Sequence, residues 1–323
     1  MIVGSLEELI GGTPMLRMHR LCAAAGVEVE LLAKLETQNP GSLKDRPALY
    51  MIDDAERRGL LSPGGTIVEA SSGNAGIALT WIGRNRGYEV VICMSELMSD
   101  EHKRVVRALG ARLELTRASE GIRGARERAQ KLATQIPGAV YIEQHHNPAN
   151  TESHAQTTGE EIWRDTAGNV DVFVHGLGSA GTIAGVARAL KAHKPSVRCV
   201  GFEPAEAPLI SAGKFRAHRL LGIGPGFVPR LYEPDLVDEL LTVKVADAFA
   251  MCREVAAREG LLVGISSGGS IHAALQLARR PEMRGATIVV IVADDGKDYL
   301  SVDGLFAVDD EQGSPAETHG ECE

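Results

Sequence analysis

The sequence has no pair of cysteines at a spacing that would hold zinc or close a small disulfide loop. Its five cysteines, Cys22, Cys93, Cys199, Cys252 and Cys322, are widely spaced and odd in number. This pattern argues against a disulfide framework and against a structural zinc site, and it fits a reducing compartment. We therefore expect a cytoplasmic protein whose site contains no metal.

Long apolar runs and an excess of positive charge are also missing. No apolar stretch approaches the ~20 residues of a membrane-spanning helix, and Glu7 and Glu8 stand where a signal peptide would carry basic residues. Lysine and arginine number 34 against 43 acidic residues, which gives a net charge of −9. We expect neither a membrane nor a nucleic acid as partner.

Glycine, in contrast, is abundant, while aromatic residues make up only 4% of the chain. The 36 glycines among 323 residues exceed the usual share of about 7%. No collagen-like period or low-complexity tract accounts for them, so they must serve particular backbone positions. Their clusters, at 73–76, 176–185, 222–226 and 264–269, should mark where the chain approaches a ligand.

Short β-branched runs alternate with longer helical patterns along most of the chain. The expected strands are Val27–Leu35, Thr66–Glu69, Glu89–Met94, Ala111–Leu115, Ala139–Ile142, Asp171–His175, Val197–Phe202 and Ala286–Val292. The expected helices are Asp45–Arg58, Asn74–Asn85, Ser99–Leu109, Ile122–Thr134, Thr182–His193, Ala246–Glu259 and Ser270–Arg279. This order predicts parallel sheets with helices on both faces. The segment Gln144–Thr158 is expected to be an irregular domain crossing, and the acidic tail Asp309–Glu323 to be poorly ordered.

The first glycine cluster has the pattern of a nucleotide site. Gly176–Gly181 reads GxGxxG between a predicted strand and a predicted helix, and Glu203 follows at the end of the next strand. These are the features of a dinucleotide fingerprint, so an NAD-dependent oxidoreductase is one candidate. Backbone amides at a helix N-terminus bind any phosphate, however, so the cofactor stays open at this point.

Two further polar glycine clusters, Ser71–Gly76 and Gly264–Ser270, are each expected just before a helix. The hydroxyls and the carboxamide of the first would suit a carboxylate, although helix capping alone accounts for such residues. Three such turns in one parallel α/β chain should converge at the carboxyl ends of strands, where these folds bind ligands.

Lys44 is placed unusually for a lysine. It lies at the start of a predicted helix, which is the unfavourable end for a cation. A lysine there is either solvated or serves as a nucleophile with a lowered pKa.

Segments 39–47, 71–76, 178–182 and 264–268 together resemble the cysteine synthase (O-acetylserine sulfhydrylase) and cystathionine β-synthase family. These are pyridoxal 5'-phosphate enzymes with the tryptophan synthase β-subunit fold, known as fold type II. The likeness runs from about Leu6 to Phe306. It implies two three-layer αβα domains with mainly parallel sheets. The large cofactor-binding domain would comprise 1–40 and 146–310, the smaller mobile substrate-binding domain 41–145, and a disordered tail 311–323.

The same resemblance implies roles for single residues. Lys44 would be the catalytic amine, bound to the cofactor as a Schiff base and later carrying the α-proton of the substrate. Asn74 would bind the ring hydroxyl of the cofactor, and Ser266 the pyridine nitrogen. The phosphate group would be held by Gly178, Ser179, Ala180, Gly181 and Thr182. The amino-acid substrate would be bound by Ser71, Ser72, Asn74, Gln144 and Gly222.

The implied reaction is β-replacement on an activated serine, with O-acetyl-L-serine and sulfide as substrates and cysteine as product. The alternative within this chemistry is another nucleophile or another serine donor, as in a cystathionine β-synthase-like or 2,3-diaminopropionate synthase-like enzyme that uses a thiol or an amine. A homologue that binds without catalysis is disfavoured because Lys44, Asn74 and Ser266 are all present. The family further implies a homodimer and suggests a serine acetyltransferase as partner.

The sequence departs from the family pattern in the lysine loop and in two glycine turns. The loop before Lys44 is one residue shorter than usual, Ala75 replaces a hydroxyl residue of the substrate loop, and Ala180 stands where glycine is usual. These changes weaken the assignment of sulfide and O-acetylserine more than that of the cofactor. The basic residues Lys214, Arg216, His218 and Arg219 are interpreted as a solvated loop near the mouth of the site.

Overall fold

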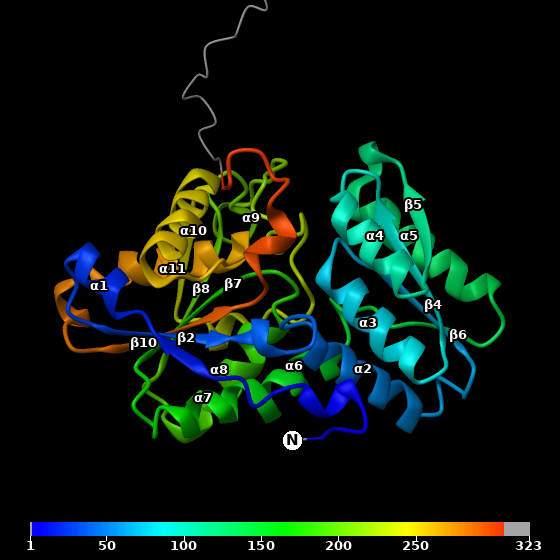
Figure 1. The fold of residues 1–323 in the computed structure, drawn as a ribbon, viewed down its shortest axis with the longest axis horizontal. Helices are drawn as coiled ribbons and strands as arrows, with labels where there is room; N and C mark the ends of the chain where they lie inside the picture. The colour runs from blue at the N-terminus through cyan, green and yellow to red at the C-terminus, as the bar shows by residue number, and fades with distance from the viewer. Residues whose placement is uncertain (1, 307–323) are drawn as a thin grey trace, which may run out of the picture.

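The computed structural model of the protein describes residues 2–306, which form two β-sheets with helices packed on both faces of each (Figure 1). The larger sheet has six strands and the smaller has four. The predicted α/β class with mainly parallel sheets is therefore confirmed. The segments expected to be a disordered tail, 311–323, lie outside the described residues.

The larger sheet is assembled from distant parts of the chain. In spatial order its strands are β1 (Met15–Arg17), β2 (Glu30–Leu35), β10 (Thr287–Val292), β7 (Val172–Gly176), β8 (Arg198–Pro204) and β9 (Glu239–Val243). All neighbours are parallel except β1 and β2. One face packs against α1 (His19–Ala25), α10 (Val245–Glu259) and α11 (Ile265–Ala278). The other is covered by α7 (Glu160–Asp165) and α8 (Gly181–His193), and α6 (Pro148–Ser153) and the π-helix η4 (His154–Gly159) pack against α8.

The smaller sheet comes from one continuous stretch of chain. Its parallel strands are β5 (Arg112–Thr116), β4 (Glu89–Ser95), β3 (Thr66–Ala70) and β6 (Ala139–Tyr141). Helices α2 (Asp45–Arg57), α3 (Asn74–Asn85) and α4 (Asp100–Ala108) cover one face, and α5 (Gly121–Gln135) covers the other. Figure 1 shows this sheet and its helices as a separate lobe, with α2 lying beside α6 of the other lobe.

Both faces of the central strands are apolar because both are buried. In β7, Val172 and Val174 enter the core under α10 and α11, whereas Phe173 enters the core under α8. Side chains alternate between the two faces of a strand, so a strand covered on both sides reads as a continuous apolar run. This explains why the runs at 172–176 and 287–292 were recognisable in the sequence.

Several sequence-based expectations require correction. Segment 144–158 is not irregular: α6 begins at Pro148, where the Asn147 side chain accepts a hydrogen bond from the Ala149 N–H, and η4 continues the helix. Helix α11 begins at Ile265, five residues before the expected start, so the third glycine cluster lies inside the helix. Helix α1 was missed, as were strands β1 and β9. Both strands lie at the edges of the sheet, where one neighbour and little burial leave a weak apolar pattern.

The remaining described elements are short. They are the helix α9 (Leu209–Ala212) and the 3₁₀ turns η1 (Leu6–Leu9), η2 (Glu36–Gln38), η3 (Ala118–Glu120), η5 (Pro234–Leu236), η6 (Pro281–Met283) and η7 (Gly296–Tyr299). Within residues 2–306, no helix has both the length and the apolar character required to cross a bilayer.

Candidate active site

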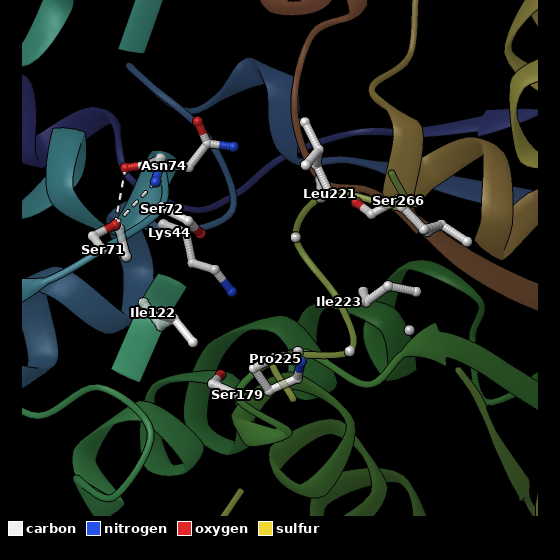
Figure 2. A pocket seen from close by; sticks show the side chains of 18 of the residues that line it. Lys44, Ser71, Ser72, Asn74, Ile122, Ser179, Leu221, Ile223, Pro225 and Ser266 are labelled. Carbon is white, nitrogen blue, oxygen red and sulfur yellow. Dashed lines mark hydrogen bonds between the residues drawn. The ribbon is translucent and has the colours of Figure 1, made fainter. Parts of the chain in front are cut away.

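A cavity of about 370 Å³ is lined by segments that follow β3, β7 and β10 at their carboxyl ends. Figure 2 shows Lys44 pointing into this space, with Ser71, Ser72 and Asn74 nearby and Ser266 and the 221–225 segment around it. Every residue that the sequence predicted for the site lines the cavity except Gly181, which lies in the glycine turn next to it. The four predicted glycine clusters therefore converge on one cavity.

The loop before Lys44 is short but firmly held. The Asp45 carboxylate accepts hydrogen bonds from the Gly41 and Ser42 N–H groups, at 2.7 and 3.2 Å, and from the Trp81 indole at 3.0 Å. The Leu43 N–H donates to the Ala293 carbonyl at 2.9 Å. These bonds place Lys44 immediately before α2 and direct its side chain into the cavity despite the shorter loop.

The electrostatic surroundings of Lys44 favour a neutral amine. Burial lowers the pKa of Lys44 from its ordinary value, and the negative charge of Asp294 opposes part of that shift. A lysine with a lowered pKa has more of its nucleophilic free-amine form near neutral pH. Lys44 thus meets the electrostatic requirement for a catalytic amine, and it is not a solvated surface residue.

The Ser71 hydroxyl organises the loop 71–76. It accepts hydrogen bonds from the Gly76 N–H at 2.8 Å and the Gly73 N–H at 3.2 Å, and it donates to the Gly73 carbonyl. A Cβ on Gly76 would lie 3.0 Å from the Ser71 Cβ, so a side chain there would crowd this turn. Among the described residues the exposed Ser72 hydroxyl makes no hydrogen bond, which leaves it available to a ligand.

Asn74 joins this loop to the other lobe. Its Nδ2 donates to Asp294 Oδ2 at 2.6 Å, and Asp294 also accepts a 2.5 Å hydrogen bond from the Tyr299 hydroxyl. The side-chain amide of Gln144 donates to the Ala70 carbonyl at 3.3 Å, next to the same loop. Asn74 and Gln144 are therefore held at the cavity wall by the protein itself.

The turn 176–182 has the structure of an anion cup. Ala180 adopts a left-handed conformation, with φ of 65°, and α8 begins at the next residue. A Cβ on Gly181 would lie 2.2 Å from Asn150 Oδ1, and one on Gly178 would lie 2.5 Å from the Gly222 carbonyl, so both positions require glycine. The N–H groups of the first helical turn lack partners within the helix and attract negative charge. Such a cup fits a phosphate.

Gly222 and Ser266 occupy the wall opposite the loop 71–76. Gly222 has φ of 87°, and a Cβ there would lie 3.7 Å from the Ser266 hydroxyl. The Ser266 side chain faces the cavity from the first turn of α11. A neutral hydroxyl in this place suits an uncharged ring nitrogen.

Several cavity residues were not identified from the sequence, namely His102, His145, His175, Asp294 and Tyr299. Burial lowers the pKa of His145 and that of His175 to about 3, and it also lowers the pKa of His102, so all three rings are neutral near pH 7. The sequence did contain a signal for Asp294. This residue lies just after the carboxyl end of the predicted strand 286–292, as Ser71 and Gly178 lie after the carboxyl ends of their own predicted strands.

Glu203 serves a structural role and does not line the cavity. Its carboxylate accepts hydrogen bonds from the N–H groups of Ile210 and Ser211, at 2.9 and 2.8 Å, at the start of α9. It is engaged with backbone rather than available for a ribose hydroxyl, so the dinucleotide interpretation loses its acidic residue. Lys214, Arg216 and Arg219 are exposed, in agreement with a solvated loop. His218 differs: it is half-buried, lines the cavity and hydrogen-bonds the Gly224 carbonyl through Nε2 at 3.0 Å.

Two parallel α/β lobes with a half-buried amine and a phosphate cup between them define an enzyme that holds a phosphorylated carbonyl cofactor. The chain matches the family model of the pyridoxal-phosphate dependent enzymes over residues 6–294, and it belongs to this family. It is a pyridoxal-phosphate enzyme of fold type II, and the described residues fit that cofactor through Lys44 and the cup 176–182.

Individual relatives cover almost the whole chain. A cysteine synthase from Staphylococcus aureus is 40% identical over 310 residues, which is 95% of this chain and 98% of the relative. A crystal structure of a cysteine synthase from Entamoeba histolytica has a TM-score of 0.91 at 39% identity and covers 97% of this chain and 93% of that one. A crystal structure of O-ureido-L-serine synthase also has a TM-score of 0.91, at 37% identity and 98% coverage of both chains.

Proposed function

We propose that the protein is a cysteine synthase that replaces the acetoxy group of O-acetyl-L-serine by sulfide. The C–O bond at the β-carbon breaks, a C–S bond forms there, and cysteine and acetate are released. The observation that carries the proposal is the Lys44 amine, with its lowered pKa, in the cavity between the loop 71–76 and the cup 176–182. The cysteine synthase relatives support the choice of substrates.

The proposed roles of the side chains are supported by their positions around the cavity. Pyridoxal phosphate, when bound, supplies an electron sink for the pair left at the α-carbon. Lys44 Nζ binds the cofactor and takes the α-proton, because an amine of lowered pKa acts as a base near neutral pH. Gly178–Thr182 hold the phosphate and Ser266 the ring nitrogen. Ser72, Asn74 and Gln144 bind the substrate carboxylate. Ser71 shapes the loop 71–76, which carries Ser72 and Asn74.

We also infer that residues 41–145 form a small domain that closes over the substrate, leaving 1–40 and 146–310 as the cofactor-binding domain. The four strands of the smaller sheet all fall within 41–145. The Asn74–Asp294 hydrogen bond joins the two parts beside the cavity, where a bound substrate would meet both. Free and substrate-bound crystal structures that superpose without relative movement of 41–145 would contradict this inference.

A second candidate keeps the chemistry and changes the nucleophile. Ala75 lies in the cavity wall and lacks the hydroxyl that the family pattern places in the substrate loop. One missing hydrogen bond is worth about 0.5–1.5 kcal/mol, enough to alter a preference between nucleophiles. The similarity to O-ureido-L-serine synthase favours a hydroxylamine-type or amine nucleophile as this second candidate.

The first experiment tests the amine. Borohydride treatment of the holoenzyme should fix one pyridoxyl group on the Lys44 peptide, as detected by mass spectrometry. Lys44→Ala should lose turnover by at least ~10³-fold, because the general base is removed. The exposed Lys131 on α5 gives a matched control, and Lys131→Ala should retain full activity. Turnover by Lys44→Ala at the native rate would overturn the proposal.

The second experiment tests the nucleophile. The enzyme is mixed with O-acetylserine and, in separate reactions, with sulfide, homocysteine, an amine or hydroxyurea, and the products are separated and identified. We expect cysteine to form with the highest kcat/KM. A higher kcat/KM with another nucleophile would replace sulfide and leave the β-replacement chemistry intact. Ala75→Thr, which restores the hydroxyl, should shift the ratio toward sulfide if Ala75 sets the preference.

A homodimer, a cytoplasmic location and binding of serine acetyltransferase are proposed from the family resemblance. Light scattering should give about twice the chain mass of 34.4 kDa, and the monomer mass would contradict the dimer.

A further inference from the structure

Asp294 is a buried acid in the cavity wall, held in place from several sides. It is only 3% exposed and directly follows Ala293, whose carbonyl accepts the Leu43 N–H at 2.9 Å and whose N–H donates to the Ser267 hydroxyl at 2.9 Å. The Asp294 carbonyl accepts the Gly264 N–H at 3.1 Å. Leu43 directly precedes Lys44, and Ala293 directly precedes Asp294. The hydrogen bond between Leu43 and Ala293 therefore fixes the positions of Lys44 and Asp294 relative to each other.

The carboxylate itself is only half satisfied. Oδ2 accepts hydrogen bonds from Asn74 and Tyr299, whereas Oδ1 is buried without a partner among residues 2–306. A Cβ on Gly264 would lie 2.0 Å from Oδ1, so the chain uses a glycine to make room for this oxygen. Burying a carboxylate with an unpaired oxygen is costly, and such groups persist where the charge is used.

The positive charge that acts on Asp294 is that of Lys44. Lys44 lowers the pKa of Asp294 and Asp294 raises the pKa of Lys44, while burial shifts both in the opposite directions. The net effect raises the pKa of Asp294 to about 6, so the group is ionised at and above neutral pH. The other titratable groups near it are Asp298 and Tyr299, both on η7, and Cys252 on α10, whose pKa the Asp294 charge raises.

We propose that Asp294 is a positioning residue for Lys44, a counter-charge held by Asn74 and Tyr299 that keeps the amine basic in a buried site. Burial alone would leave the amine a weak base, and a weak base removes a proton slowly. Because Asn74 belongs to the loop 71–76, the same carboxylate ties the substrate loop to the lysine. This inference rests on the proposed role of Lys44.

The test measures the basicity of Lys44 directly in the cofactor-free protein. Competitive labelling with acetic anhydride from pH 6.5 to 11, read by peptide mass spectrometry, gives the apparent pKa of Lys44, with the exposed Lys131 as internal reference. Asp294→Asn keeps the side-chain shape and removes the charge. It should lower the apparent pKa of Lys44 by about one unit.

The surroundings of Lys44 allow this titration to be interpreted. The other titratable groups whose pKa values respond to its charge are His145 in the loop after β6, His154 in η4 and His175 on β7. Burial lowers the pKa of each, to about 3 for His145 and His175, so the three rings stay neutral across the range measured.

Tyr299→Phe is the matched control, because it removes one hydrogen bond to Asp294 and leaves the charge. It should leave the apparent pKa of Lys44 within about 0.3 units of the native value. Asp294→Ser is a second uncharged variant, used if Asp294→Asn fails to fold. An uncharged variant whose Lys44 titrates as in the native protein would overturn the inference, and so would an equal shift in Tyr299→Phe.

The role of Lys44 and the role of Asp294 can be disproved independently. If borohydride fixes the cofactor on Lys44 but Asp294→Asn leaves its titration unchanged, only the role of Asp294 falls. If borohydride does not fix the cofactor on Lys44, the proposed function of Lys44 falls whatever Asp294 does.

Discussion

At the scale of single residues, Ala180 beside the cavity has a strained backbone conformation. Ala180 adopts φ of 65° at the start of α8, in the left-handed region where glycine is common and alanine is rare. The conformation costs about 1–2 kcal/mol for a residue with a Cβ.

Replacement of Ala180 by glycine should therefore stabilise the protein. We expect the unfolding free energy to rise by about 0.5–1 kcal/mol, since relief of strain exceeds the added freedom of the unfolded chain. Ala184→Gly, one turn later in the same helix, should lower it by about 1 kcal/mol, because that position has helical geometry. The unfolding free energies of both variants are measured by denaturant unfolding followed by circular dichroism. If the two substitutions changed the unfolding free energy in the same direction, strain at Ala180 would be contradicted.

At the scale of elements, helix α2 links the lobes. It packs against α3 on one side and α6 on the other. Arg46, two residues after Lys44, is fully buried and donates hydrogen bonds to Glu36 after β2 and to Glu161 on α7 at 2.7–2.9 Å. Lys34 joins the same network through Glu161 at 2.8 Å. The start of α2, and Lys44 with it, is thus tied to the larger sheet.

Removal of the Arg46 charge should destabilise the fold strongly. Arg46→Met leaves the buried Glu36 carboxylate without its charged partner and leaves Glu161 paired with Lys34 alone, a change that costs about 3–5 kcal/mol. Arg57→Met, on the same helix, removes only an exposed ion pair with Asp54 and should cost less than about 1 kcal/mol. The two variants are compared by their denaturation midpoints, and similar losses would show that the buried network contributes little.

Elements with strong local signals were predictable from the sequence, and those defined by distant partners were not. Helix α3 was predicted with its observed limits, because apolar spacing and the turn at Gly73 both mark its start. The edge strand β1 is three residues long and exists only because it pairs with β2. The start of α11 was missed because Gly268 and Gly269 suggest a loop. In the fold they allow close packing, since a Cβ on Gly268 would lie 2.4 Å from the Cys252 sulfur.

For the whole molecule, the cavity exists only because two separately formed sheets face each other across it. The loops after β3, β7 and β10 and the start of α2 supply its wall from segments up to about 250 residues apart. Parallel strands end at the same edge of a sheet, so each sheet collects its own functional loops. The Asn74–Asp294 hydrogen bond then connects a loop of the smaller sheet to a loop of the larger sheet.

The sequence by itself determined the fold class, the glycine turns, the candidate lysine and the resemblance to pyridoxal-phosphate enzymes. Each of these is local: a spacing, a helix start or a short motif carries its own signal. Only the tertiary structure decided that Glu203 caps a helix, that Ser71 builds its loop, and that Asp294 lies close enough for its charge to raise the pKa of Lys44. The physical reason is that a hydrogen-bond partner or a counter-charge is set by distance in space. The chain brings residues 43–44 beside residues 293–294 only through the folded structure, where the Leu43 N–H bonds the Ala293 carbonyl.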